Sequence, residues 1–158
     1  MTDHPEGTLF RHVSVFDGTG APGFLADVSV RGRHIEHVRP HGAGGPALAA
    51  PPGWRCVDGR GATLLPGLVE SHAHLTFPSS VGRPIARPPE EAVLAHVTAR
   101  NARILLESGY TSAFSAGARS PRVEVALRDE IDGGWLPGPR LRACSVERGA
   151  AGIGGALG

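Results

Sequence analysis

Two helical stretches that alternate with short strands constrain the fold of this chain most strongly. The first is predicted between Pro89 and Gly109, because proline suits the first turn and glycine stops a helix. Glu90 and Glu91 follow the proline, where the helix dipole favours negative charge. Its apolar side chains fall within one stripe of about 120° and are Val93, Leu94, Val97, Ile104 and Leu105. This pattern is typical of a helix that packs on a sheet.

A second helix is predicted to follow Ser120, which supplies the N-cap, with Pro121 at the first helical position. Gly133 and Gly134 end it. The apolar positions that share one face are Val123, Ala126, Leu127 and Ile131.

Short apolar stretches surround these helices and predict strands. They are "LLPGLVESHAHL" (64–75), "YTSAFSA" (110–116) and "PGPRLRACSV" (137–146). The resulting order, strand, loop, helix, strand, helix, strand, predicts an α/β fold whose parallel sheet has right-handed crossovers.

The residues before this region predict a small β-domain. Residues 8–15, 27–30 and 34–38 mix alternation with β-branched side chains and are separated by turn signals, which is typical of a β-meander. A Gly/Pro/Ala-rich loop follows at 40–53. We therefore predict a small β-domain over 1–62 and a second domain over 63–158.

Composition excludes several classes of protein. Hydrophobic residues make up 41% of the 158, enough for a core, and 16 basic against 15 acidic residues argue against nucleic-acid binding. The start of the chain has no secretory signal pattern, and no apolar run of about 18 residues exists, so no membrane association and a cytoplasmic location are expected. Cys56 and Cys144 lack metal-site spacing and are expected to be buried free thiols.

His72 and His74 stand one residue apart after an apolar run, in "LLPGLVESHAHL". Side chains at i and i+2 of a strand share a face, so both rings can reach one metal ion. With eight histidines in the chain, chance alone yields about 0.4 such pairs. The spacing by itself therefore does not identify a metal site.

The sequence around the pair resembles the metal-dependent amidohydrolase superfamily, in its imidazolonepropionase/prolidase-like branch. "LLPGLVESHAHL" is similar to the first barrel strand of that family, and "TLFRHVSVFDGTGAPGFLADVSVRGRHIEHV" with "VDGRGATLLPG" is similar to its small N-terminal β-domain. "LLESGYTSAFSAG" and "ALRDEIDGGWLPGPRLRA" resemble the units that follow. Together these stretches cover most of residues 8–144.

The resemblance implies a function and a set of site residues. It makes His72 and His74 ligands of a divalent metal, most often zinc. Glu70 takes the acidic position before them, where both an outer or structural role and direct contact with the metal are open. It implies hydrolysis of non-peptide carbon-nitrogen bonds in small amide or cyclic amide substrates through metal-activated water. The fold it implies is a small β-domain, half of a composite β-sandwich, followed by the first βα units of a TIM-like (β/α)8 barrel.

The chain departs from the family in the later part of the site. Family members add a carboxylated lysine or another acidic ligand, two later histidines and a catalytic aspartate. This chain has no lysine and no histidine after His96. Asp129 and Asp132 fall in the predicted second helix and do not match the catalytic aspartate. We therefore expect no catalytic residue here, weak metal binding and no activity of the chain alone.

The length of the chain, 158 residues, also argues for an incomplete protein, because a closed barrel needs about 250 residues. We expect an incomplete barrel, an N-terminal portion of an amidohydrolase, whose exposed sheet edges favour self-association. Three alternatives stay open at this stage: a noncatalytic binding or assembly fragment that supplies His72 and His74 to a partner, a prolidase-like dipeptidase, and a small α/β protein without a metal.

Overall fold

The computed structural model describes residues 6–77 and 90–146. The chain divides into two compact units between Pro66 and Gly67. This division lies four residues beyond the predicted boundary at 62/63, because Thr63 and Leu64 pair with the first strand of the β-domain. We describe each unit by itself.

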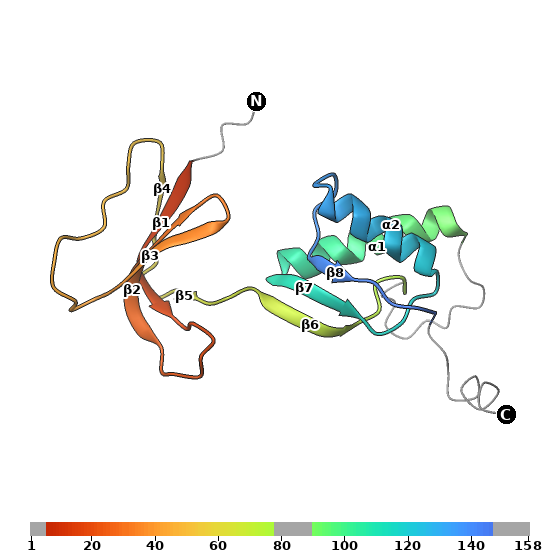
Figure 1. Ribbon diagram of the computed structural model, residues 1–158, viewed down its shortest axis with the longest axis horizontal. Helices are drawn as coiled ribbons and strands as arrows, with labels where there is room; N and C mark the ends of the chain where they lie inside the picture. The colour runs from red at the N-terminus through yellow and green to blue at the C-terminus, as the bar shows by residue number, and fades with distance from the viewer. Residues whose placement is uncertain (1–5, 78–89, 147–158) are drawn as a thin grey trace. The chain divides into compact units, whose positions relative to one another are not determined.

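The first unit is a five-stranded mixed sheet (Figure 1). Its strands are β1 (Gly7–Val15), β2 (Phe24–Arg31), β3 (His34–Pro40), β4 (Arg55–Asp58) and β5 (Thr63–Leu64). The first three form the predicted antiparallel meander, in the order β3-β2-β1. β4 and β5 both run parallel to β1 on its other side. The predicted loop at 40–53 corresponds to the connection between β3 and β4.

Alternate residues of β1 and β2 build the core of this unit. One buried cluster consists of Val13, Val15, Ala26 and Val28. Leu9, which also belongs to β1, is fully buried. Cys56 is exposed on β4, contrary to the predicted burial, because β4 lies at the end of the strand path. Cys144 is intermediate, and both thiols are free as expected.

A buried carboxylate stabilises an irregularity in β1. The β1–β2 register shifts between Phe10 and Val13, and His12 adopts a positive φ of 56° there. Asp27 is only 8% exposed, and its Oδ1 accepts the His12 backbone N–H at 2.9 Å and pairs with His41 Nε2 at 3.0 Å. Burial raises the pKa of Asp27, but the bonds from His41 and His12 outweigh it, so the net pKa lies below the usual 3.8.

We expect Asp27→Asn to destabilise the first unit in a pH-dependent way. Since the folded pKa of Asp27 is depressed, the charged form stabilises the fold above pH 3.8, and this contribution is lost as the pH falls through the lowered pKa. The variant should lose about 1 kcal/mol near pH 7 and less at the lowest pH at which the protein stays folded, because the lowered pKa is then being titrated. Hydrogen exchange of β2 amides measures this, with the exposed Asp132→Asn as control. An equal deficit at both pH values would contradict the assignment.

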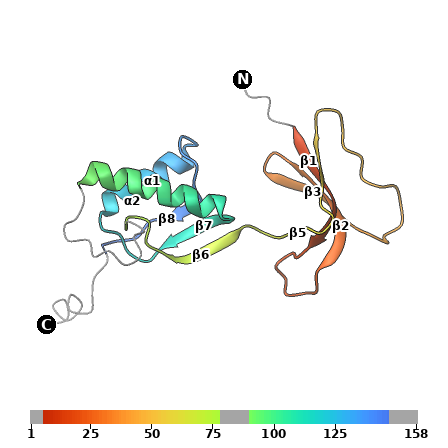
Figure 2. The ribbon, with the colours of Figure 1, turned by 180° about the vertical axis from the view of Figure 1, so that it is seen from behind.

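The second unit alternates strands and helices. Its elements are β6 (Leu68–Ala73), α1 (Glu91–Glu107), β7 (Tyr110–Ser115), α2 (Pro121–Asp132) and β8 (Arg140–Arg142). The strands are parallel, as predicted, and lie in the order β6-β7-β8. Figures 1 and 2 show α1 and α2 side by side on the same face of this sheet. The α/β class is therefore confirmed. The incomplete barrel stays a prediction.

Local signals located both helices well. Ser120 caps α2, its Oγ accepting the Val123 N–H at 3.5 Å, and Gly133 ends it. In α1 the buried residues are Leu94, Thr98 and Ala102. The predicted stripe was wrong in part, since Val93 and Ile104 are 51% and 49% exposed.

The spacing of the buried residues explains the correction in α1. Leu94, Thr98 and Ala102 recur at i, i+4 and i+8, so the buried face is turned away from Val93 and Ile104 and toward smaller residues. The core of the unit consists of Ala73, Leu75, Ala102, Ala113, Leu127 and Leu141.

The loop predicted between the strand at 64–75 and the first helix lies mainly outside the described residues, at 78–89, as does the glycine-rich stretch after Val146. Within the described ranges, neither helix has the length and apolar character needed to span a membrane.

Candidate functional site

The two predicted ligands lie together at the carboxyl end of β6. His72 belongs to the strand, and His74 follows its last residue, Ala73. Ala73 points into the core at 6% exposure, so the alternation of the strand directs the histidines away from that core. The Nε2 atoms of the two rings are 3.2 Å apart.

The other nitrogen of the His74 ring contacts the main chain. Nδ1 lies 3.1 Å from the carbonyl oxygen of Gly117, in the loop after β7. A carbonyl oxygen only accepts, so Nδ1 carries the proton and the neutral ring keeps its lone pair on Nε2. Metal-bound histidines commonly have this arrangement, with the second ring nitrogen donating to a carbonyl or a carboxylate.

The spacing of the two Nε2 atoms fits a shared metal ion. Metal–nitrogen bonds of about 2.1 Å in tetrahedral geometry separate two ligand nitrogens by about 3.4 Å. The observed 3.2 Å is close to that separation. Without an ion, the same distance allows His72 Nε2 to donate to His74 Nε2. The residues therefore fit a metal as a pair of ligands.

A turn after β6 restrains His74 further. Phe77 N–H donates to the His74 carbonyl at 3.2 Å, and the Phe77 ring lies edge-on to the imidazole with centroids 5.4 Å apart. Asn101 of α1 donates through Nδ2 to the carbonyls of Leu75 and Phe77, at 2.8 and 2.9 Å. The backbone segment that follows His74 is therefore hydrogen-bonded to α1 through Asn101.

Glu70 lies beside the pair but bonds to the backbone. Its Oε1 accepts the N–H of His72 at 3.0 Å. Glu70, His72 and His74 line a cavity of about 340 Å³ together with Asn101 and other side chains of α1. Glu70 is itself part of β6 and bonds to the backbone beside it, so its outer role at a metal stays a prediction.

His72 and His74 have no third His, Cys, Asp or Glu grouped with them in the part of the chain that the structure describes. Across residues 6–77 and 90–146, no group of three or more His, Cys, Asp or Glu side chains is arranged to hold a metal. A catalytic zinc usually has three protein ligands. Asp129 and Asp132 are exposed on α2, as predicted, and Asp129 accepts from Arg128 at 2.7 Å.

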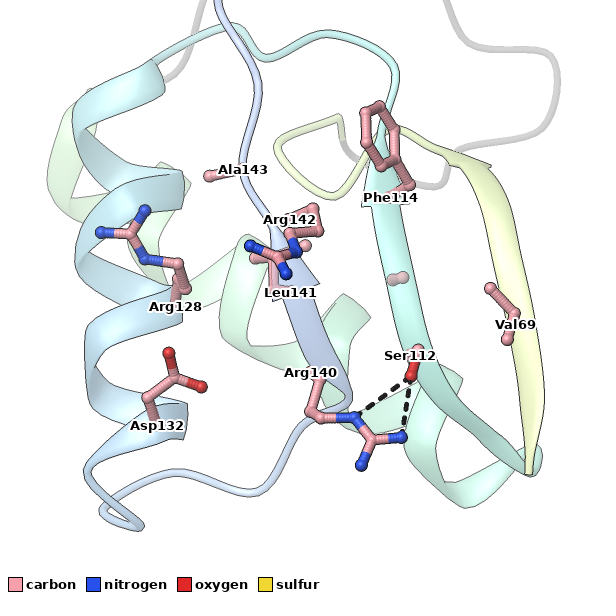
Figure 3. Close-up of a pocket in the computed structure, with 10 residues that line it drawn as sticks. Val69, Ser112, Phe114, Arg128, Asp132, Arg140, Leu141, Arg142 and Ala143 are labelled. Carbon is pink, nitrogen blue, oxygen red and sulfur yellow. Dashed lines mark hydrogen bonds between the residues drawn. The ribbon is translucent and has the colours of Figure 1, made fainter. Parts of the chain in front are cut away.

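A larger cavity, of about 610 Å³, lies away from the histidines (Figure 3). Arg128 and Asp132 of α2 lie on one side of it, and Arg140 and Arg142 of β8 lie nearer its centre. Arg140 donates through Nε and Nη2 to Ser112 Oγ at 3.3 and 3.1 Å. This cavity is lined by arginines and by neither His72 nor His74. We therefore do not assign the metal site to it, although it is the larger of the two cavities.

Packing explains the glycine that precedes the pair in "LLPG". A Cβ on Gly67 would lie 2.6 Å from the Cβ of Thr111, closer than side chains approach. Leu68 N–H donates to the Gly109 carbonyl at 2.9 Å at the same point. Glycine therefore lets β6 begin directly beside β7.

Sequence patterns did not reveal three contacts near the ends of β6 and β7. The Gly117 carbonyl accepts from His74, Asn101 donates to the Leu75 carbonyl, and the fully buried Glu124 accepts from Ser115. One signal was present, because Glu124 is a charged residue next to the apolar stripe of α2.

Comparisons with known proteins now bear on this geometry. A comparison with protein-family models finds no match, and a comparison with curated proteins finds none either. Solved structures do match. A phenylurea hydrolase B is 23% identical with a TM-score of 0.67, and the match covers 89% of this chain and 30% of that protein.

Two further structures are similar to the same extent. A Xaa-Pro dipeptidase with bound methionine is 24% identical with a TM-score of 0.68, covering 89% of this chain and 33% of the dipeptidase. A molinate hydrolase is 24% identical, also with a TM-score of 0.68, and the match covers 87% of this chain and 29% of the hydrolase. This chain thus spans a third or less of the length of each.

These neighbours are members of the amidohydrolase superfamily, and the three matches cover 87–89% of this chain. At such low identity the likeness establishes the fold. The predicted resemblance is therefore confirmed at that level: this chain has the fold of part of an amidohydrolase.

Proposed function

We propose that this chain is part of a metal-dependent hydrolase that cleaves carbon-nitrogen bonds in small amide or cyclic amide substrates. The observation that carries the proposal is the His72–His74 pair, whose Nε2 atoms lie 3.2 Å apart while Nδ1 of His74 contacts a carbonyl. Phenylurea and Xaa-Pro dipeptides, named in two structural neighbours, both contain a carbonyl carbon bound to nitrogen.

In this proposal His72 and His74 hold the ion, which is zinc by preference, since imidazole nitrogens suit it. Bound metal would supply a Lewis acid that activates water for attack on a carbonyl. Gly117 fixes the proton of His74 on Nδ1, and Glu70 supports the backbone at His72. The residues that move protons in the reaction lie outside this set.

We also propose that the chain by itself is catalytically incomplete. The described residues supply two ligands, one fewer than a catalytic zinc usually has. The expected properties are weak zinc binding and no turnover. A noncatalytic assembly role would use the same pair, with a partner chain adding the other ligands.

A dipeptidase activity is the second candidate. Its support is the similarity to the Xaa-Pro dipeptidase, which matches as well as the other hydrolases do. Substrate choice between dipeptides and other amides would depend on residues beyond the histidine pair.

Zinc titration of the full chain, followed through the imidazole signals by NMR, tests the proposal. We expect the signals of His72 and His74 to change first and together, at one ion per chain, because their two Nε2 atoms lie 3.2 Å apart, close to the separation of two nitrogens on one ion. Signals of the exposed His34 and His37 serve as the internal control.

Two results would contradict the proposal. Zinc that perturbs His12 and His41 before the proposed pair would remove the ligand assignment. Steady hydrolysis of N-acyl amino acids, Xaa-Pro dipeptides or cyclic amides by the purified chain would contradict its incompleteness.

A further inference from the structure

The carboxylate of Glu124 is fully buried in the second unit, although it lies on α2 between an exposed and a half-buried residue. Burial of a carboxylate is costly unless both oxygens are satisfied. Here both accept hydrogen bonds: Oε1 from Ser115 Oγ at 2.9 Å, and Oε2 from the Cys144 N–H at 3.1 Å. One side chain thus joins the end of β7 to the segment that follows β8.

Both hydrogen-bond partners of Glu124 are connected to the peptide between Gly117 and Ala118, whose carbonyl oxygen contacts His74. Ser115 Oγ also accepts the N–H of Gly117, at 3.4 Å. On the other side, the backbone carbonyl of Ser145, the residue after Cys144, accepts the N–H of Ala118 at 3.0 Å. The peptide between Gly117 and Ala118 is therefore held through its N–H by Ser145, while its carbonyl oxygen accepts from His74 Nδ1.

A carboxylate suits this position because it faces two donors. The Cys144 N–H can only donate, and the Ser115 hydroxyl donates to Glu124 while it accepts from Gly117. Glutamine keeps the shape but offers one acceptor oxygen, so it satisfies Cys144 and must donate to Ser115. Alanine removes both bonds.

We propose that Glu124 is a positioning residue for the metal site: through Ser115 and Cys144 it fixes the Gly117 carbonyl, which sets the ring orientation and tautomer of His74. This inference rests on the proposed function for the role of the metal. The orientation of His74 itself does not depend on metal, and that difference makes the two separable by experiment.

The test compares Glu124→Ala and Glu124→Gln with wild type in the full chain. Thr98→Val is the matched control, because Thr98 is also fully buried in this unit and its hydroxyl bonds only within α1, to the Leu94 carbonyl at 2.7 Å. Two readouts are taken on folded protein: the tautomer of His74 from the ring nitrogen signals without metal, and the zinc dissociation constant.

We expect Glu124→Ala to weaken zinc binding about 10- to 100-fold, the usual cost of losing an outer partner of a ligand. It should also mix the His74 tautomers. Glu124→Gln should fall between the alanine variant and wild type, and Thr98→Val should match wild type in both readouts.

The outcomes separate the two proposals. Unchanged His74 signals and zinc affinity in folded Glu124→Ala would overturn the positioning role. If that variant does not fold, a Glu124→Gln variant identical to wild type in both readouts would overturn it instead. Zinc that fails to bind wild-type His72 and His74 would remove the proposed function, while the tautomer readout would still decide the role of Glu124.

Discussion

Replacing His72 and His74 together by alanine is expected to remove the specific binding of one zinc ion by this chain. The two Nε2 atoms, 3.2 Å apart, are the only chelating pair proposed among the described residues. Loss of an outer partner of a ligand costs about 10- to 100-fold in affinity, so loss of both ligands should cost more. Isothermal titration of wild type and variant at equal folded fraction measures the difference.

The matched control for this experiment is His34→Ala/His37→Ala. It removes the same number of histidines from a strand, and both side chains are exposed on β3. It should bind zinc as wild type does. Equal zinc uptake by both double variants would show that the metal is held elsewhere and would contradict the ligand assignment.

Leu127→Ala is expected to lower the free energy of unfolding of the second unit by about 2–5 kcal/mol. Leu127 is 6% exposed and belongs to the core cluster that also contains Ala73, the residue between the two histidines. Truncation would remove buried apolar surface and leave a cavity under the sheet. Hydrogen exchange of β7 amides measures the change, and β2 amides of the first unit should keep their protection.

Val125→Ala serves as control on the same helix. Val125 is 36% exposed, and substitutions at such positions usually change stability by about 0.5 kcal/mol or less. If both variants lost the same protection in β7, the loss would reflect the helix as a whole, and the assignment of Leu127 to the core would be wrong.

Sequence patterns predicted the elements of this protein because their signals are local. Ser120 and Pro121 mark the start of α2, and Gly133 marks its end, since capping and backbone restrictions act within a few residues. The alternation of β1 and β2 likewise predicted the meander. The parallel direction of β6, β7 and β8 was predicted from the alternation of strands and helices.

The same patterns were less reliable for what each helix buries. In α1 the largest apolar residues were expected to face the sheet, yet Thr98 and Ala102 are fully buried and Val93 is half exposed. The predicted stripe was placed by the largest apolar residues, whereas the buried face follows Leu94, Thr98 and Ala102 at i, i+4 and i+8. The face that a helix buries depends on its neighbours as well as on its own pattern.

The sequence by itself determined the strand-helix order and the adjacency of His72 and His74, because both depend on residues that are close along the chain. The tertiary structure decided how that pair is oriented. The bond from His74 to Gly117 spans 43 residues, that from Asn101 to Leu75 spans 26, and that from Cys144 to Glu124 spans 20. Such contacts form only when the sheet and the helices pack together, and no local pattern specifies them.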